Sequence, residues 1–426
     1  MMRSTRRNKN ILRIIYFSVL INHIKTHGLI WLIKKIFSRC LKELAWILLL
    51  PISIPLHLLR FRRLLFRVEH IGHLAAEFDT YIKAKHLGLL PKKRYFYFVL
   101  APKKKVANMH LLNYWRSQVP IITNFIACAF LNIVTKHFFM RYDVSNYISG
   151  FFGTQDIYRI NNMWDNRPPL LVLSDADKNG CKNLLETIGI SAEEWFVCLH
   201  VRESGFLPHN EFIQSHRNAS IGNITTAIQE IVSRGGKVVR MGDKSMTPLP
   251  FMRGVIDYAH HALKSERMDV VLCAKAKFFL GCTSGLSFVS MVFGVPIAQA
   301  NMIPVAALSV TRQDMSIPKL LWSELENRYL SFNEILSSPV GDFYFTQQYT
   351  KSAIRVEENS PEDIYELTVE MLDRLEGKFI ESDEDKKFHE KYLSFFKPGH
   401  YSYGATSKVC IAFLRRHQHL FDMTDK

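Results

Sequence analysis

Apolar runs of strand length alternate with segments of helical periodicity through the C-terminal half of the chain. Four apolar runs end abruptly in polar, charged or glycine-rich turns: 195–201, 237–241, 278–281 and 295–298. Three segments with an apolar face at helical spacing lie between them: 221–233, 268–275 and 285–293. Strands that alternate with helices are typical of a doubly wound parallel sheet. The pattern therefore predicts an α/β fold in this region.

A less regular alternation is found earlier in the chain. It predicts strands at 67–70, 95–100 and 121–122, and helices at 74–85, 109–115 and 125–134. From Phe138 to Pro169 neither periodicity is clear, which predicts loops and a boundary between domains. A further helix is predicted at 361–375. We therefore divide the chain into a helical segment at 1–66, α/β domains at 67–190 and 191–376, and a helical extension at 377–426.

Positive charge is concentrated before the α/β region. The chain has 426 residues and a formal net charge of +16, yet residues 1–67 hold 14 of its 55 Lys and Arg residues and only one of its 39 acids, Glu43. The nearly neutral remainder disfavours nucleic acid as a partner, because such binding needs a basic face on a folded domain. Seven cysteines without CxxC spacing indicate a reducing compartment and no zinc site.

Apolar runs are interleaved with these basic residues. Residues 11–21 and 44–59 are apolar but shorter than the roughly 20 residues of a spanning helix, and Pro51 and Pro55 interrupt the second run. Apolar residues beside Lys, Arg and Trp suit a helix that lies on an anionic leaflet. We expect peripheral association with the cytoplasmic face of the inner membrane, and we expect a chain beginning near Arg67 to stay soluble. The alternative is that these helices pack on the protein's own core.

Arg202 closes the otherwise apolar strand at 195–201. Ligands of open α/β sheets bind beyond the carboxyl ends of the strands. A guanidinium group at such a position can contact a diphosphate through two parallel hydrogen bonds. The alternative is an ion pair with Glu203 or Asp243. Gly205 and the loop around it favour ligand contact, since they leave space for a ligand.

Other polar residues follow the predicted strands, and most of them have either a ligand-binding or a structural interpretation. Arg217 and Asn218 precede a helix, so they can contact the ligand, or Asn218 or Ser220 can cap that helix. Asp243 can bind a ligand hydroxyl or cap a turn. Asp257 can contact a ribose or a base, although this signal is weak by itself.

Small residues join the strand at 278–281 to the helix that follows. Thr283, Ser284, Gly285 and Ser287 allow the backbone to approach an anion, which the amides and the positive end of the helix would then face. The segment has no lysine-bearing phosphate loop, so ATP hydrolysis is not implied. The alternative is an ordinary Ser or Thr cap. Together with an arginine on a preceding strand, the segment favours phosphate binding.

His73 follows a glycine at the end of the strand predicted at 67–70. If two α/β domains face each other across a cleft, this histidine can act as a general base. A single histidine is more often structural. Glu203 and Glu211 are the alternative bases.

Five segments, in this order, resemble a group of bacterial glycosyltransferases linked to cell-envelope polysaccharides: IGHLA (71–75), HVRESGF (200–206), RNASI (217–221), MGD (241–243) and FLGCTSGLSFVSMVFGVP (279–296). The layout also distantly resembles fucosyltransferases of the GT-B type, in which an HxR motif at a strand end binds the nucleotide-sugar diphosphate. The resemblance covers roughly 67–301 and is weaker towards Glu376. It implies two facing Rossmann-like domains, with the nucleotide sugar in the C-terminal one and acceptor contacts from the N-terminal one.

The residues that match the family motif most securely are Arg202 and Ser284. Gly205 stands where an aspartate closes the fucosyltransferase HxRxxD motif, which argues against fucose as the donor. Since no DxD motif occurs in a convincing context, the resemblance implies a transfer that needs no metal.

These observations predict a membrane-associated glycosyltransferase that uses a nucleotide sugar, no further cofactor, and a glycan or lipid-linked acceptor. Arg202 and the turn at 283–287 would stabilise the diphosphate leaving group electrostatically. One alternative is a nucleotide-sugar 2-epimerase, which can share the two-domain fold but is expected to be soluble. A second alternative is a non-catalytic scaffold at the membrane.

Overall fold

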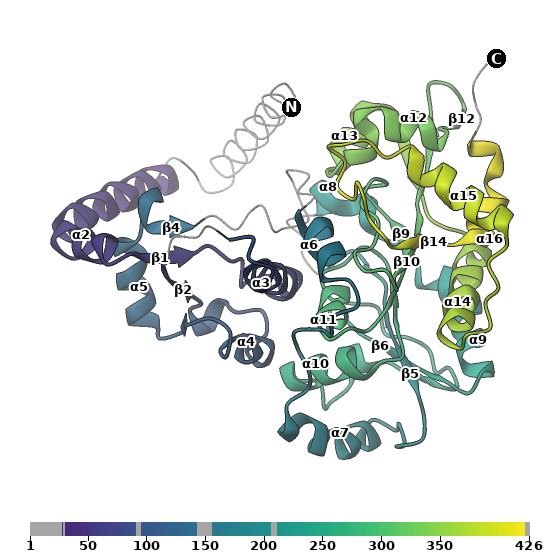
Figure 1. The fold of residues 1–426 in the computed structure, drawn as a ribbon, viewed down its shortest axis with the longest axis horizontal. Coiled ribbons are helices and arrows are strands. Elements are labelled where there is room, and N and C mark those ends of the chain that lie inside the picture. Colours follow the sequence, from purple (N-terminus) through teal and green to yellow (C-terminus); the bar gives the residue numbers. More distant parts are fainter. Residues whose placement is uncertain (1–27, 29, 91–94, 143–155, 206–210, 422–426) are drawn as a thin grey trace. The chain divides into compact units, whose positions relative to one another are not determined.

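The computed structural model describes residues 28, 30–90, 95–142, 156–205 and 211–421 (Figure 1). The apolar run at 11–21 lies outside the described residues. The described chain forms two compact units that are interleaved along the sequence. Unit 1 takes residues 28–65, 95–105 and 119–142, and unit 2 takes 66–90, 106–118 and the described residues from 156 onward. Neither unit coincides with the ranges 67–190 and 191–376.

Unit 1 is built on a four-stranded parallel sheet in the order β3-β2-β1-β4. Its strands are β1 (Phe61–Leu64), β2 (Phe96–Leu100), β3 (Ile121–Ile122) and β4 (Arg141–Tyr142). The strand predicted at 67–70 is wrong, because the backbone there leads into the next helix and the strand lies earlier. Arg67 N donates to the Glu77 side chain, and Val68 O accepts from Ala107 N. The strands predicted at 95–100 and 121–122 are confirmed.

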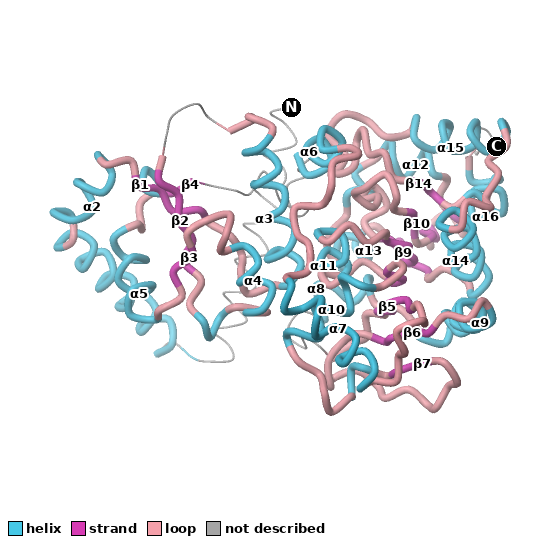
Figure 2. The backbone as a smooth tube through the Cα atoms, turned by 60° about the horizontal axis from the view of Figure 1, so that its bottom comes forward, coloured by secondary structure: helices cyan, strands magenta, loops and turns pink. Residues whose placement is uncertain are grey.

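Three helices complete unit 1: Ile30–Leu48, α2 (Leu50–Leu58) and α5 (Phe125–Val134). The first two meet at a bend of 62°, which follows from Pro51 in the first turn of α2 because proline has no N–H to donate. Pro55 lies inside α2 without ending it. Among the described residues no single helix has the length and hydropathy to cross a membrane, although this bent pair does when taken together. Figures 1 and 2 show α2 and α5 on the same face of the sheet.

Unit 2 contains a seven-stranded parallel sheet in the order β14-β10-β9-β8-β5-β6-β7. Its strands are β5 (Phe196–His200), β6 (Lys237–Arg240), β7 (Val255–Ile256), β8 (Phe279–Gly281), β9 (Ile297–Met302), β10 (Met315–Pro318) and β14 (Lys408–Val409). The chain runs from β5 outward to β7, returns to the other side of β5 with β8, and continues outward to β10. This is the strand order of a dinucleotide-binding Rossmann fold, and the order reverses between β5 and β8.

Helices cover both faces of this sheet, which confirms the predicted doubly wound α/β fold (Figure 2). One face carries α9 (Thr225–Ser233) and α14 (Pro361–Leu375), and the other carries α10 (Glu266–Lys275) and α11 (Ser287–Val292). On this second face, α3 (Ile71–His86) packs against α11, and α4 (Met109–Trp115) packs against α10. The central strand β5 is buried from Phe196 to Leu199, because helices on both sides require an apolar strand.

Further elements of unit 2 were not predicted individually. Its other helices are α6 (Asp156–Trp164), α7 (Asp175–Thr187), α8 (Glu211–Gln214), α12 (Phe332–Ser337), α13 (Thr346–Lys351), α15 (Asp383–Ser394) and α16 (Ile411–Arg416). The last two, α15 and α16, lie in the helical extension predicted at 377–426. A small antiparallel sheet contains β11 (Leu320–Ser323), β12 (Arg328–Tyr329) and β13 (Ile354–Glu357). The loops predicted from Phe138 to Pro169 therefore contain a helix, α6, whose Ile157 and Ile160 are buried.

Candidate functional site

The carboxyl ends of β5 and β8 lie side by side where the strand order reverses. This position is where open α/β sheets bind ligands. Backbone contacts hold the two ends together, since Cys282 N donates to His200 O over 3.2 Å and Arg202 N donates to Cys282 Sγ over 2.9 Å. Gly281 is required for this approach, because a Cβ atom there would lie 2.5 Å from His200 O. The predicted residues Arg202 and Ser284 are thus brought to one edge of the sheet.

Arg202 is held by Asn218 and not by an ion pair with Glu203 or Asp243. Its Nε donates to Asn218 Oδ1 over 3.1 Å, and its Nη2 lies 3.8 Å from Glu211 Oε1. Its side chain is only 13% exposed. Burial, and then the charge of Arg217, lowers the pKa of Arg202, although a guanidinium group stays charged in proteins. The interpretation of Arg202 as the partner of one of those two acids is therefore wrong.

Two more cations join Arg202 around Asn218. Arg217 Nη2 donates to Thr283 O over 2.7 Å, which ties it to the turn after β8. Lys319, directly after β10, donates from Nζ to Asn218 O over 2.6 Å, and the residue is 3% exposed. Burial lowers the pKa of Lys319. Sequence reasoning missed this lysine, although its position next to the end of an apolar strand was a usable signal.

Several buried polar atoms of this region have no hydrogen-bond partner within the described structure. They are His200 Nδ1, Glu211 Oε1, His216 Nε2, Arg217 Nε and Ser284 Oγ. Burial lowers the pKa of His200 to about 4 and that of His216 to about 3, so both imidazoles are neutral at pH 7. Buried polar atoms are almost always paired in native proteins. Their concentration beside three cations indicates a site for a polar, anionic ligand.

In the turn after β8, two hydroxyl groups support the backbone and a third has no partner in the described structure. Thr283 Oγ1 accepts from Gln299 Nε2 over 2.9 Å and from Ile303 N over 3.1 Å. Ser287 Oγ donates to Ser284 O over 2.9 Å, which fixes the turn from the other side. Ser284 Oγ alone among these hydroxyls has no partner in the described structure. The helix predicted at 285–293 is shorter, so the charge at its end contributes little.

His73 lies on α3 and not at the end of a strand, which corrects its predicted position. Its Nδ1 lies 2.7 Å from Oε1 of Glu77, one helical turn later. Glu77 is fully buried, and its Oε2 accepts from Arg67 N over 2.9 Å. The preceding Gly72 packs directly on Gly285, since a Cβ atom at Gly72 would lie 2.6 Å from Gly285 Cα. The start of α3 is therefore next to the turn after β8 within unit 2, and the catalytic role of His73 stays a prediction.

The remaining predicted acids make structural contacts. Glu203 binds Arg240 through Oε1 at 2.7 Å and Thr247 N through Oε2 at 2.9 Å. Asp257 binds Arg240 through Oδ1 at 3.0 Å and Leu249 N through Oδ2 at 2.9 Å. Because Arg240 is completely buried, its charge requires these two carboxylates.

Turn and helix caps occupy two further polar side chains near the strand ends. Asp243 Oδ1 accepts from Ser245 N over 2.7 Å, which is the contact of a turn cap. Ser220 Oγ accepts from Gly222 N over 3.2 Å, so Ser220 caps the helical turn that precedes α9. Asn218 is thereby left to hold Arg202. The ligand-binding roles predicted for Asp243 and Asp257 and the catalytic role predicted for Glu203 stay predictions, and these contacts favour structural roles.

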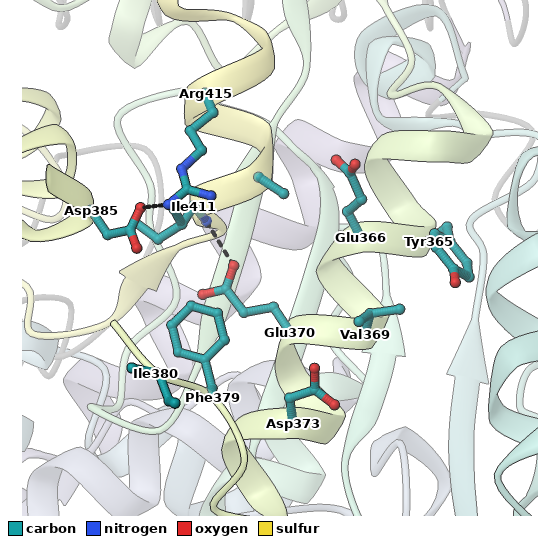
Figure 3. Close-up of a pocket in the computed structure, with 11 residues that line it drawn as sticks. Tyr365, Glu366, Val369, Glu370, Asp373, Phe379, Ile380, Asp385, Ile411 and Arg415 are labelled. Carbon is teal, nitrogen blue, oxygen red and sulfur yellow. Dashed lines mark hydrogen bonds and ion pairs between the residues drawn. The ribbon is translucent and has the colours of Figure 1, made fainter. Parts of the chain in front are cut away.

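A pocket of about 200 Å³ is found elsewhere in unit 2, between α14, α15 and α16 (Figure 3). Its acidic side chains already have partners: Glu370 accepts from Ile411 N over 2.8 Å, and Asp385 pairs with Arg415. It contains none of the residues at the ends of β5 and β8, so the strand ends are the stronger candidate. Within the described residues, no group of three or more His, Cys, Asp or Glu side chains is arranged to hold a metal ion.

The fold defines an α/β protein with a candidate anion site at the reversal of a Rossmann strand order. No family model matches the chain. No curated protein matches it either.

Three solved structures illustrate the similarity that is found. Escherichia coli ADP-heptose lps heptosyltransferase II is 13% identical with a TM-score of 0.37, over 61% of this chain and 91% of that one. The iron-containing heptosyltransferase TibC of enterotoxigenic E. coli, in complex with ADP-D-beta-D-heptose, is 14% identical with a TM-score of 0.35, over 57% and 58%. A family 9 glycosyl transferase from Veillonella parvula is 12% identical with a TM-score of 0.23, over 51% and 60%. Similarity at this level assigns neither a family nor an activity.

Proposed function

We propose that this protein is a glycosyltransferase that binds the diphosphate of a nucleotide sugar at the ends of β5 and β8. The main support is that three cations, Arg202, Arg217 and Lys319, lie close together there. Next to them is the hydroxyl of Ser284, which has no hydrogen-bond partner in the described structure. A diphosphate supplies several acceptor oxygens and negative charge in one compact group. A diphosphate therefore supplies acceptor oxygens for the three cations and for the donors among the atoms without partners, Ser284 Oγ and Arg217 Nε.

The same cations suit the chemistry of the leaving group. As the bond between the anomeric carbon and the diphosphate oxygen breaks, negative charge grows on the departing nucleoside diphosphate. Donors that are already fixed around this position stabilise that charge without rearranging. Asn218 fixes Arg202, and the carbonyl of Thr283 fixes Arg217, so the donor set is organised before the ligand arrives.

His73 is the base in this proposal, and Glu77 is its positioning residue. The carboxylate oxygen Oε1 of Glu77 lies 2.7 Å from Nδ1, which favours the tautomer with its proton on Nδ1, and in that tautomer the other ring nitrogen, Nε2, carries a lone pair. The acceptor hydroxyl then gives its proton to Nε2 while its oxygen bonds to the anomeric carbon. The nucleoside diphosphate leaves with the electrons of the broken bond. The motif resemblance suggests a cell-envelope glycan or a lipid-linked sugar as the acceptor, and the proposal needs no metal.

A calorimetric screen of the purified full chain against UDP-, GDP-, ADP-, dTDP- and CMP-sugars tests this proposal. We expect binding of at least one diphosphate sugar and weaker binding of the CMP-sugar, which carries one phosphate. Incubation of the bound sugar with and without candidate glycan acceptors then separates the activities, with mass spectrometry for a glycosylated acceptor and proton NMR for the configuration of the sugar nucleotide. An isomerised sugar nucleotide without an acceptor would indicate an epimerase, and a complete absence of nucleotide binding would contradict the proposed site.

A further inference from the structure

Unit 1 exposes a continuous set of large apolar side chains on its helices. In the helix Ile30–Leu48 eight such residues are more than half exposed: Ile30, Ile33, Ile36, Phe37, Leu41, Leu44, Ile47 and Leu48. At 100° per residue, these positions fall on one stripe of the helix. An apolar stripe of this kind normally covers a protein core, yet here it is turned to solvent. It therefore needs a partner other than the described part of unit 1.

The elements beside this helix extend the exposed apolar surface. On α2 the residues Ile52, Ile54 and Leu58 are 41%, 50% and 72% exposed. On α5, Phe125 and Ile126 are 70% and 75% exposed. Both helices lie on the same face of the unit 1 sheet, and Ser53 Oγ of α2 donates to Val134 O of α5 over 3.0 Å. We call the exposed apolar residues of these three helices the apolar face of unit 1.

Charge distinguishes unit 1 from the rest of the described chain. Its described residues include 12 Lys and Arg residues and one acid, Glu43, which pairs with Lys136. The described residues of unit 2 include 33 Lys and Arg residues and 35 acids, so they are close to neutral. Lys34 is exposed at the edge of the apolar stripe, and Lys35 is exposed on the opposite, polar side of the same helix. The partner of the apolar face is thus expected to be both apolar and negatively charged.

We propose that the apolar face of unit 1 docks on a lipid leaflet that contains anionic lipids, with α5 inserting beside the N-terminal helices. A leaflet offers acyl chains to the apolar stripe and negative headgroups to the lysines. A second copy of the chain is a poorer partner, because it would bring two strongly basic surfaces together. The helix Ile30–Leu48 lies in the plane of the headgroups, since Lys34, Lys35 and Arg39 would be costly to bury in the hydrocarbon.

The contribution of α5 to the apolar face could not be inferred from the charge or hydropathy of the N-terminal segment. Phe125 and Ile126 are far from that segment in sequence, and they join it only because α5 packs beside α2. Removing the N-terminal segment is a poor test, since a chain beginning near Arg67 lacks β1, the strand that pairs with both β2 and β4. Substitutions of single exposed residues leave this sheet intact, so they test the proposal better than the truncated chain does.

Co-sedimentation of the full chain with phosphatidylcholine vesicles, with and without phosphatidylglycerol, tests the proposal. We expect the protein to pellet with the anionic vesicles and far less with the neutral ones. The double variant Phe125→Ser/Ile126→Ser should reduce partition to anionic vesicles roughly tenfold or more, since it removes the apolar contacts of α5. Lys34→Glu/Lys35→Glu should reduce the preference for anionic lipid, since it lowers the net charge of the described unit 1 from +11 to +7.

The matched control is Phe251→Ser/Ile380→Ser, which replaces residues of unit 2 that are 95% and 90% exposed. It should sediment like the wild type. Equal sedimentation of all variants, or a wild type that leaves vesicles unbound, would overturn the proposal. So would a dimer in light scattering without lipid that the Phe125→Ser/Ile126→Ser change dissociates, because the apolar face would then bind a second copy. Nucleotide affinity, measured separately, distinguishes this failure from failure of the proposed transferase activity.

Discussion

Replacement of Arg202 by alanine tests the diphosphate site most directly. The guanidinium group of Arg202 is largely buried at the end of β5, and its Nε is already occupied by Asn218. Its terminal nitrogens have one nearby carboxylate, Glu211, at 3.8 Å, which is longer than a hydrogen bond. They are therefore the part of the side chain available to phosphate oxygens.

The size of the effect follows from the kind of contact that is lost. A hydrogen bond to a charged group contributes about 1.5–3 kcal/mol to stability, and truncation also leaves the phosphate without a buried partner. We expect Arg202→Ala to weaken nucleotide-diphosphate binding by about 2 kcal/mol, which corresponds to a loss of roughly thirtyfold in affinity. Arg202→Lys should recover part of this loss, because it keeps the charge but not the paired geometry.

Calorimetry with the nucleoside diphosphate of the preferred donor gives the affinity, and inorganic pyrophosphate gives the diphosphate contribution alone. Circular dichroism and the melting temperature establish that each variant is folded. The control variant is Arg253→Ala, which removes an arginine outside the residues of the candidate site. It should bind the nucleotide like the wild type. An unchanged affinity in folded Arg202→Ala would refute the assignment of this strand end as the diphosphate site.

Three further predictions concern catalysis, metal and pH. Glu77→Gln should lower kcat roughly tenfold or more while KM and nucleotide affinity stay near the wild-type values, because the carboxylate orients His73 and does not touch the donor; an unchanged kcat would remove Glu77 from the mechanism. Activity should survive excess EDTA, and a complete loss restored by Mn²⁺ or Mg²⁺ would reveal a metal site. Burial lowers the pKa of His216 to about 3 and that of His389 to about 4, from 6.5, so below pH 6.5 the unfolded chain takes up protons that the folded chain does not. The contribution of these two histidines to stability should therefore be complete above pH 6.5 and fall as the pH is lowered towards 4, and His389→Gln should make this loss smaller in thermal denaturation.

Much of the architecture follows from local pattern. The helices Met109–Trp115, Phe125–Val134 and Pro361–Leu375 have the predicted bounds, because each has an apolar face, a clear start and a clear stop. The strand at 61–64 was missed because Arg62 and Arg63 made it look like part of the basic segment. The helix at 156–164 was missed because its polar residues hid two buried isoleucines.

The site was predictable only in part. Arg202 and Ser284 could be placed together, because the order of parallel strands brings their carboxyl ends to one edge of a sheet. The buried cation Arg240 could not be foreseen, and it pairs with two carboxylates, Glu203, which was predicted as an alternative base, and Asp257, which was predicted to contact the ligand. Such pairs depend on tertiary contacts between residues 37 and 17 positions apart, for which the sequence contains no local signal.

The arrangement of the candidate anion site also has a consequence for folding. Its contacts join residues 66, 80 and 101 positions apart: Arg217 with Thr283, Arg202 with Cys282, and Asn218 with Lys319. No single loop can form it, so the site exists only when β5, β8 and β10 are in register. A nucleotide at one hundred times its Kd would therefore add about 2.7 kcal/mol to the unfolding free energy of the whole sheet. Amide hydrogen exchange should slow throughout these strands, far beyond the atoms that the ligand touches.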